Sequence, residues 1–235
     1  MTTSSHALLL VALSLLTSAI LSCATADFVA WCTAFIGTLL LGVQLGIGIG
    51  VLTSMVLIVL RTARPNNAVL GRLPRTNIFR DLTRYPEAQT IPGVLIFRFD
   101  ASLHFANKDV FHAAVSNAVQ EWQSKTGDDG LTAVVIEFSP VNDVDASALR
   151  MLQDLLKELK EQHLRLLLAG CKGPVRDMMR RSGFLTAISP NSLCVSLGEA
   201  AKYGARLHAV RTSRPDLAPA PSLTCLLYTS PSPRD

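Results

Sequence analysis

The feature that most restricts how this chain can fold is a long stretch without charged side chains near its start. Residues 7–60 contain one acidic residue, Asp27, and neither lysine nor arginine. A helix on the surface of a soluble domain has a polar face, and this stretch has none. The hydrocarbon core of a bilayer requires about 20 apolar residues per helix, so the stretch is long enough for several membrane segments. The sequence therefore predicts a membrane part followed by a part that carries nearly all the charge.

The first apolar run covers residues 7–24 and has nearly the length of a membrane helix. A secretory signal peptide is the alternative, because Ala24-Thr25-Ala26 has the small-residue pattern of a cleavage site. The preceding MTTSSH lacks the lysine or arginine of a signal peptide, and more apolar sequence follows directly. Residues 1–26 are therefore predicted to form an extra apolar helix or a signal-like segment.

The second apolar run, residues 28–60, is longer than one membrane helix requires, since it would measure about 50 Å at 1.5 Å per residue. Gly42, Gln44 and Gly46 offer a break, which predicts a hairpin of two short helices within residues 27–64. Gly46, Gly48 and Gly50 would allow another helix to approach closely. One long tilted helix is the alternative. The two expected helices are 28–41 and 46–60.

Six arginines follow between residues 61 and 84, as is typical of the cytoplasmic side of a membrane segment. They can also contact anionic lipid head groups, so membrane lipid is an expected partner. Only Phe79 and Tyr85 accompany them as aromatic residues, and the net charge is only +4, so a nucleic-acid surface is not indicated. Prolines recur here, which predicts an arginine- and proline-rich linker over residues 65–91.

Residues 92–209 alternate between strand and helix patterns, which predicts an α/β domain with a mixed sheet flanked by helices. Asn107 is expected to cap one of the helices and Gly183 to end another. A turn is expected at 127–130 and a disordered tail at 210–235, whose end from residue 224 resembles translated adapter sequence. The expected strands are 94–99, 102–105, 131–138, 164–169 and 193–195, and the expected helices are 107–125, 147–162, 173–182 and 197–208.

The five cysteines do not form a recognisable site, because they are scattered and form no CxxC pair. Cys171 and Cys194 lie in apolar stretches, where a buried free thiol in a reducing compartment is expected. No phosphate-binding GxxxxGK[ST] motif and no series of nucleophile, base and orienting residue occurs. The sequence therefore predicts no metal, no cofactor and no enzyme activity.

A series of short motifs resembles the carboxy-terminal part of SulP-family sulfate permeases of the plant and algal type. Each motif alone is unspecific, but their order is kept over more than half of the chain. The motif Asp27-Phe28 stands just before the predicted hairpin. The others lie at residues 64–65, 68–74, 76–81, 85–88, 91–96, 105–107 and 139–145.

The resemblance implies that residues 92–209 form a STAS domain that faces the cytosol, and that the hairpin is the last one of a transporter core. It implies proton-coupled sulfate transport with a regulatory STAS domain, in the plasma membrane or an organelle membrane. The implied partners are the remainder of the transporter core, a cytosolic regulatory protein and a second copy of the chain. We expect no transport by this chain alone, since the family carries a dozen or more membrane segments. The alternative is a membrane-tethered STAS binding module without transport activity.

The loop Asp143-Val144-Asp145-Ala146-Ser147 is the most informative candidate site, because it leads from a central strand into a helix. Asp145 or Ser147 can cap that helix by accepting hydrogen bonds from its first turn. The resemblance adds a second role for Ser147, which aligns with the phosphorylated serine of bacterial anti-sigma-factor antagonists. Asp143 and Asp145 would repel a phosphate there, and plant transporters usually carry threonine in place of Ala146. Capping and regulatory phosphorylation therefore both stay open.

Overall fold

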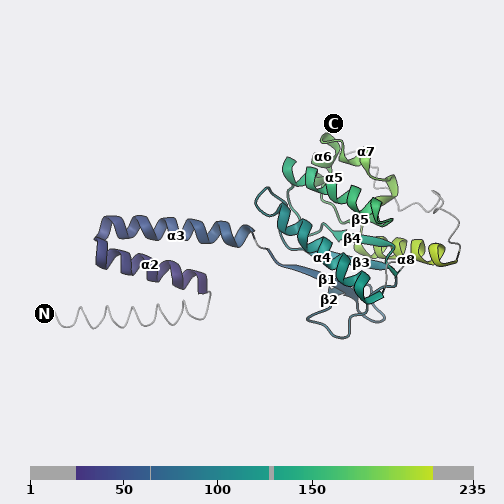
Figure 1. Cartoon of the computed structure of the whole chain (residues 1–235), viewed down its shortest axis with the longest axis horizontal. Helices are drawn as coiled ribbons and strands as arrows, with labels where there is room; N and C mark the ends of the chain where they lie inside the picture. The colour runs from purple at the N-terminus through teal and green to yellow at the C-terminus, as the bar shows by residue number, and fades with distance from the viewer. Residues whose placement is uncertain (1–24, 64, 127–129, 214–235) are drawn as a thin grey trace. The chain divides into compact units, whose positions relative to one another are not determined.

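The structure is a computed structural model that describes residues 25–63, 65–126 and 130–213 (Figure 1). The chain divides into two compact units, Met1–Ala63 and Arg64–Asp235. The extra segment expected at 1–26 falls outside the described residues up to residue 24, as do most of the turn at 127–130 and the tail from 214.

The first unit contains a hairpin of two helices, α2 (Thr25–Leu41) and α3 (Val43–Ala63), as expected. The break is narrower than expected, because only Gly42 lies outside the helices. Its φ of +87° is accessible to glycine without the steric cost of a side chain. Gln44 and Gly46 are wrong as parts of the break, since both lie in the first turn of α3. The single long helix is not observed.

Gly46 instead allows α2 and α3 to pack closely. A Cβ atom on Gly46 would lie 2.3 Å from the backbone nitrogen of Thr38, and one on Gly50 would lie 2.7 Å from the Cβ of Ala34. Gly48 meets nothing within 4 Å. Two of the three glycines of the expected small-residue face therefore contact the partner helix of the hairpin.

The second unit is built on a six-stranded mixed sheet, with helices on both faces, as the sequence predicted. The strand order is β2-β1-β3-β4-β5-β6; neighbours from β3 to β6 are parallel, and the pairs of β1 with β2 and β3 are antiparallel. The strands are β1 (Asn67–Arg72), β2 (Phe79–Asp81), β3 (Val94–Phe99), β4 (Ala133–Glu137), β5 (Arg165–Ala169) and β6 (Leu193–Cys194).

Figure 1 shows the helices packed around this sheet, and two apolar clusters hold them against it. The larger cluster packs most of the helices against one face, with Phe111 perpendicular to Phe99 at a ring distance of 5.1 Å. The smaller cluster packs Ala200 and Ala201 of the last helix against the other face. On the first face lie α4 (Lys108–Thr126), α5 (Ala146–Glu161), α6 (Gly173–Arg181) and α7 (Phe184–Ala187), and on the second lies α8 (Leu197–Ser213).

The expectation of a linker over residues 65–91 was wrong, because strands β1 and β2 lie within this segment. Leu70 is almost fully buried, with 3% of its surface exposed, and it belongs to the cluster under α8. β1 pairs with β3 through the register of Val69 with Phe97. The arginines of this segment lie at exposed positions of short strands and turns, so their charge does not prevent sheet formation.

Three smaller expectations also change. Residues 102–105 do not form the expected strand; only Leu103 pairs, in an isolated bridge with Val144. The Asn107 side chain does not cap α4; its oxygen accepts from the His104 N–H and its nitrogen donates to the Ser102 carbonyl. It therefore fixes the loop before the helix. At the other end of the domain, α8 continues to Ser213, so residues 210–213 of the expected tail are helical.

Candidate functional site

The loop between β4 and α5 is fixed by a second loop, which precedes α4. The Leu103 N–H donates to the carbonyl of Asp143 at 3.0 Å, and the Asp145 N–H donates to the carbonyl of Leu103 at 3.1 Å. Val144, between the two aspartates, is fully buried. The 143–147 segment therefore has a defined shape, although it lies at the end of the sheet where the strands give way to loops.

Asp145 makes the interactions that order this segment. One carboxylate oxygen accepts from the N–H of Ala148 at 2.7 Å, which caps α5. The other accepts from the N–H of Phe105 at 2.7 Å and so joins the two loops. Carboxylates at a helix start also gain from the helix dipole. Of the two capping candidates, the structure assigns the cap to Asp145.

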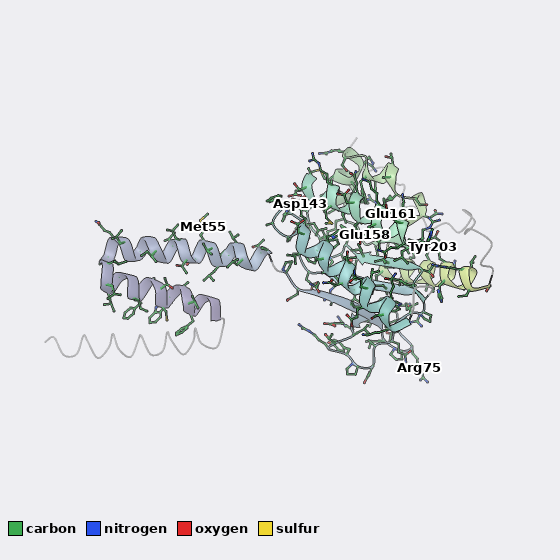
Figure 2. All side chains as sticks on the ribbon, viewed as in Figure 1. Met55, Arg75, Asp143, Glu158, Glu161 and Tyr203 are labelled. Carbon is green, nitrogen blue, oxygen red and sulfur yellow. The ribbon has the colours of Figure 1, made fainter. Side chains whose placement is uncertain are left out.

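Ser147 is the second residue of α5 and is half-exposed. Ala146 before it is exposed, as is Asp143, which Figure 2 labels. The Asp143 carboxylate accepts from the neighbouring Val144 N–H at 2.9 Å. Arg150 is exposed three residues after Ser147, so the two side chains are neighbours on the helix surface. Sequence reasoning missed Arg150, although the spacing of serine and arginine contained the signal.

A lysine from the end of the next strand also reaches this loop. The Lys172 ammonium donates to the side-chain oxygen of Asn142, immediately before Asp143. Lys172 precedes α6, whose start has no side-chain cap. The segment thus contains two carboxylates, Lys172 is bonded to the residue before it, and Arg150 lies one turn after Ser147 on α5.

A separate charged group lies at the ends of β3 and β4. Burial raises the pKa of Glu137, and the nearby Arg98 guanidinium opposes this shift. Arg98 pairs with Asp100 at 2.8 Å. The His104 N–H donates to the Asn107 side chain, and the His104 carbonyl accepts from the N–H groups of Asn107 and Lys108. Asp100 and His104 therefore both take part in structural contacts.

Cys32 and Cys171 are free thiols. Burial raises the pKa of the Cys171 thiol to about 12, and Cys194 is buried with 2% exposure. The expectation of a buried thiol is confirmed at Cys194, whereas the Cys171 residue is half-buried although its thiol is desolvated. Within the described ranges, no three histidine, cysteine, aspartate or glutamate side chains gather in a way that could hold a metal ion.

The hairpin contains the apolar surface that a membrane segment requires. Val43–Leu60 is long and apolar enough to cross a membrane, and only 11% of this window is buried within the structure. Phe28–Leu41 is a shorter apolar helix. On α3, large side chains such as Leu52, Met55 (labelled in Figure 2) and Ile58 are each more than 60% exposed.

Comparisons with known proteins give one match to the second unit and others that extend over most of the chain. A family model described as the STAS domain matches residues 85–200. "Sulfate transporter 1.1" of Arabidopsis thaliana is 36% identical over 177 residues, which cover 74% of this chain and 27% of that protein. "High affinity sulfate transporter 2" of Stylosanthes hamata is 31% identical over 189 residues, covering 78% and 28%. The chain thus spans about a quarter of the length of these relatives.

Solved structures agree on the fold. The murine Solute Carrier 26 family member A9 anion transporter, in the inward-facing state, superposes with a TM-score of 0.66 at 21% identity. The superposition covers 78% of this chain and 29% of the transporter. A further structure of SLC26A9 gives a TM-score of 0.69 at 17% identity, covering 82% and 32%. At sequence identities of 21% and 17%, these superpositions show that the fold is similar.

Proposed function

The chain belongs to the SulP family, as its carboxy-terminal part with the STAS domain, and on this premise we propose that it serves a secondary active sulfate transporter. In this proposal α2 and α3 are the last membrane hairpin of the transporter core. The STAS domain lies on the cytosolic side and regulates the core. Transport is coupled to protons and requires the remainder of the core.

One observation carries the proposal. The similarity to "Sulfate transporter 1.1" extends over 177 residues at 36% identity, which is more than the 116 residues that the STAS model matches. The shared sequence therefore continues beyond the STAS match, as expected for one continuous part of a transporter. The exposed apolar surface of α3 supports the same assignment, since such a surface needs lipid or further helices around it.

A chimera tests this proposal directly. Residues 27–209 replace the matching part of "Sulfate transporter 1.1", and uptake of labelled sulfate is measured in yeast cells that lack their own sulfate transporters. The matched control is the same transporter truncated at the junction. We expect the chimera to transport sulfate well above the control at equal membrane abundance. Uptake no higher than that of the control would favour the alternative, a membrane-tethered binding module without transport activity.

The cytosolic position of the STAS domain and the coupling to protons are each tested by a separate measurement. A cytosolic STAS domain predicts that added protease cleaves residues 92–209 only after sealed, right-side-out vesicles are opened. Proton coupling predicts that uptake by the chimera rises with an inward proton gradient and falls when an ionophore dissipates it. Uptake that follows an imposed sodium gradient instead would contradict proton coupling.

Within this transporter we propose Ser147 as a regulatory phosphorylation site. The half-exposed serine lies in the first turn of α5, where open backbone N–H groups and the helix dipole favour an added phosphate. Arg150 and Lys172 supply positive charge nearby. We expect Ser147→Asp and Ser147→Ala to change uptake by the chimera in opposite directions. If both leave it unchanged, the switch does not exist.

A further inference from the structure

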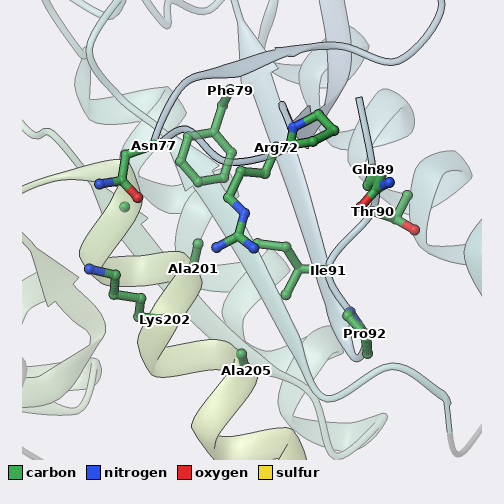
Figure 3. A pocket seen from close by; sticks show the side chains of 12 residues that line it. Arg72, Asn77, Phe79, Gln89, Thr90, Ile91, Pro92, Ala201, Lys202 and Ala205 are labelled. Carbon is green, nitrogen blue, oxygen red and sulfur yellow. The ribbon is translucent and has the colours of Figure 1, made fainter. Parts of the chain in front are cut away.

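A second feature of the domain lies on the α8 face of the sheet, opposite to α5. The β1–β2 hairpin, the segment from Gln89 to Pro92 and α8 enclose an open hollow with a volume of about 410 Å³ (Figure 3). This volume is within the range of about 300–1,000 Å³ that small-molecule sites occupy. A single inorganic oxyanion would fill only a small part of it.

The charge of this hollow has one sign. Arg72 from β1 and Lys202 from α8 line it, and none of its lining residues is aspartate or glutamate. In the part of the chain that the structure describes, neither cation forms an ion pair with a carboxylate. Two exposed cations of different elements at one hollow, without a counter-charge, create a positive potential that favours an anion.

Three carboxylates, Asp81, Glu87 and Glu199, occur in or next to these elements, and none of them lines the hollow. The Asp81 carboxylate, at the end of β2, accepts from the N–H and the hydroxyl of Thr83 at 2.8 and 2.7 Å and lies 3.6 Å from Arg84. Glu199 is three residues before Lys202 on α8, but one of its carboxylate oxygens is buried and the pair forms no salt bridge within the described residues. Arg72 and Lys202 thus remain available to a ligand.

The rest of the lining is apolar or a neutral hydrogen-bonding group. Figure 3 shows the Arg72 side chain reaching toward α8, with Phe79 and Ile91 on either side of it. Ala201 and Ala205 form the wall on α8, and the Asn77 and Gln89 amides add donors and acceptors. A ligand that satisfies both kinds of surface has an apolar or planar body and an anionic group.

The hollow is also held in shape by the backbone. Arg72 and Gln89 exchange two hydrogen bonds, Arg72 N–H to the Gln89 carbonyl at 2.8 Å and Gln89 N–H to the Arg72 carbonyl at 2.9 Å. Arg72 also stands opposite Phe79 in the β1–β2 pair. Three lining residues are therefore fixed before any ligand binds, which reduces the entropy lost on binding.

We propose that this hollow is a binding site for a small organic anion, with a planar or apolar body against Phe79 and Ile91 and one phosphate, sulfate or carboxylate group between Arg72 and Lys202. The bound anion connects the β1–β2 hairpin to α8. The site does not depend on sulfate transport by the parent protein, since it is formed within the domain alone.

Ligand-observed NMR with the full chain in detergent micelles tests the site, with 4-nitrophenyl sulfate and 4-nitrophenyl phosphate as probes. Inorganic sulfate and 4-nitroanisole represent the two halves of the probe. We expect the whole probes to bind more tightly than either half. Arg72→Gln and Lys202→Gln should each weaken binding about five- to tenfold, as expected for loss of one charge-assisted contact at an exposed site.

The matched control is Arg75→Gln, which removes the same charge from the same hairpin at a position that does not line the hollow. It should leave probe affinity unchanged. Equal affinity for the Arg72→Gln, Lys202→Gln and Arg75→Gln chains would overturn the proposal, as would equal binding of 4-nitroanisole and the charged probes. Tighter binding of an acidic peptide than of any probe, with the same dependence on Arg72, would also overturn it, because the hollow would then be a protein interface.

Discussion

Replacement of Asp145 by alanine tests whether one side chain orders the candidate loop. In the native domain its two carboxylate oxygens accept from the N–H groups of Ala148 and Phe105, both at 2.7 Å. Asp145→Ala therefore removes the cap of α5 and the link between the loops before α4 and α5. Both losses concern the folded state, so they should lower the free energy of unfolding.

The two contributions can be estimated separately. Loss of an N-cap side chain costs about 1 kcal/mol, within a range of about 0.5–2. The Phe105 N–H lies at an exposed residue, so water can replace the lost acceptor and the cost there is about 0.5–1 kcal/mol. We therefore expect Asp145→Ala to destabilise the domain by about 1.5–2 kcal/mol. Asp145→Asn keeps a capping oxygen and should cost less than about 1 kcal/mol.

Urea unfolding followed by tryptophan fluorescence measures this difference. The chain has two tryptophans, so Trp31→Phe in the hairpin leaves Trp122, which packs against the core of the domain, as the reporter. With a slope of about 2 kcal/mol per molar urea, the expected loss moves the midpoint down by about 0.7–1 M. The unfolding is measured with the full chain in detergent micelles.

Asp143→Ala is the matched control, because Asp143 is exposed in the same loop and its carboxylate accepts only from the adjacent Val144 N–H among the described residues. It should change the unfolding free energy by less than about 0.5 kcal/mol. If Asp145→Ala costs no more than Asp143→Ala, the two hydrogen bonds do not order the loop and the reasoning is refuted.

Three further predictions concern other parts of the chain. Gly46→Ala should increase the distance between α2 and α3, because the added Cβ would lie 2.3 Å from the Thr38 backbone nitrogen. Gly48→Ala should leave this distance unchanged, since its Cβ would meet nothing within 4 Å. Disulfide crosslinking between cysteine pairs introduced in the two helices measures the distance. Burial raises the pKa of the Cys171 thiol to about 12, so this thiol should resist iodoacetamide at pH 8 in the native chain and react after unfolding. Mass spectrometry measures the reaction, and equal rates in the native and the unfolded chain would contradict the prediction. Burial raises the pKa of Glu137, so the native state binds the proton of this carboxyl more tightly than the unfolded state does. The free energy of unfolding should therefore fall as the pH rises above about 4.5. Glu137→Gln should make this fall smaller when urea unfolding is compared at pH 4 and 7, and an unchanged fall would exclude Glu137 as its source.

The sequence predicted the parallel part of the sheet well, because strands β3, β4 and β5 are continuous apolar runs buried on both faces. It missed β1 and β2. Their six and three residues include Asn67, Arg72 and Arg80, and only Leu70 and Gly71 are buried. β1 is ordered by pairing with β3, and β2 by pairing with β1, and these pairings cannot be recognised in a local pattern.

The candidate site was predicted in part. Aspartate before a helix is a preferred cap, so Asp145 was named from local sequence. Its second hydrogen bond joins it to Phe105, 40 residues earlier, and depends on how two loops meet at the end of the sheet. Lys172 likewise reaches Asn142 from 30 residues away. Contacts between distant segments therefore form the part of the site that spacing and composition did not contain.

The position of β1 between β2 and β3 has a practical consequence for isolating the domain. A piece that starts at residue 85, where the STAS match begins, would lack both antiparallel strands and leave β3 with an unpaired edge. Free N–H and C=O groups along such an edge pair readily with other chains, which promotes aggregation. A piece that starts at residue 65 retains Asn67–Arg72 and closes this edge. The start of the α/β domain is thus set by strand pairing and precedes the STAS match by about 20 residues.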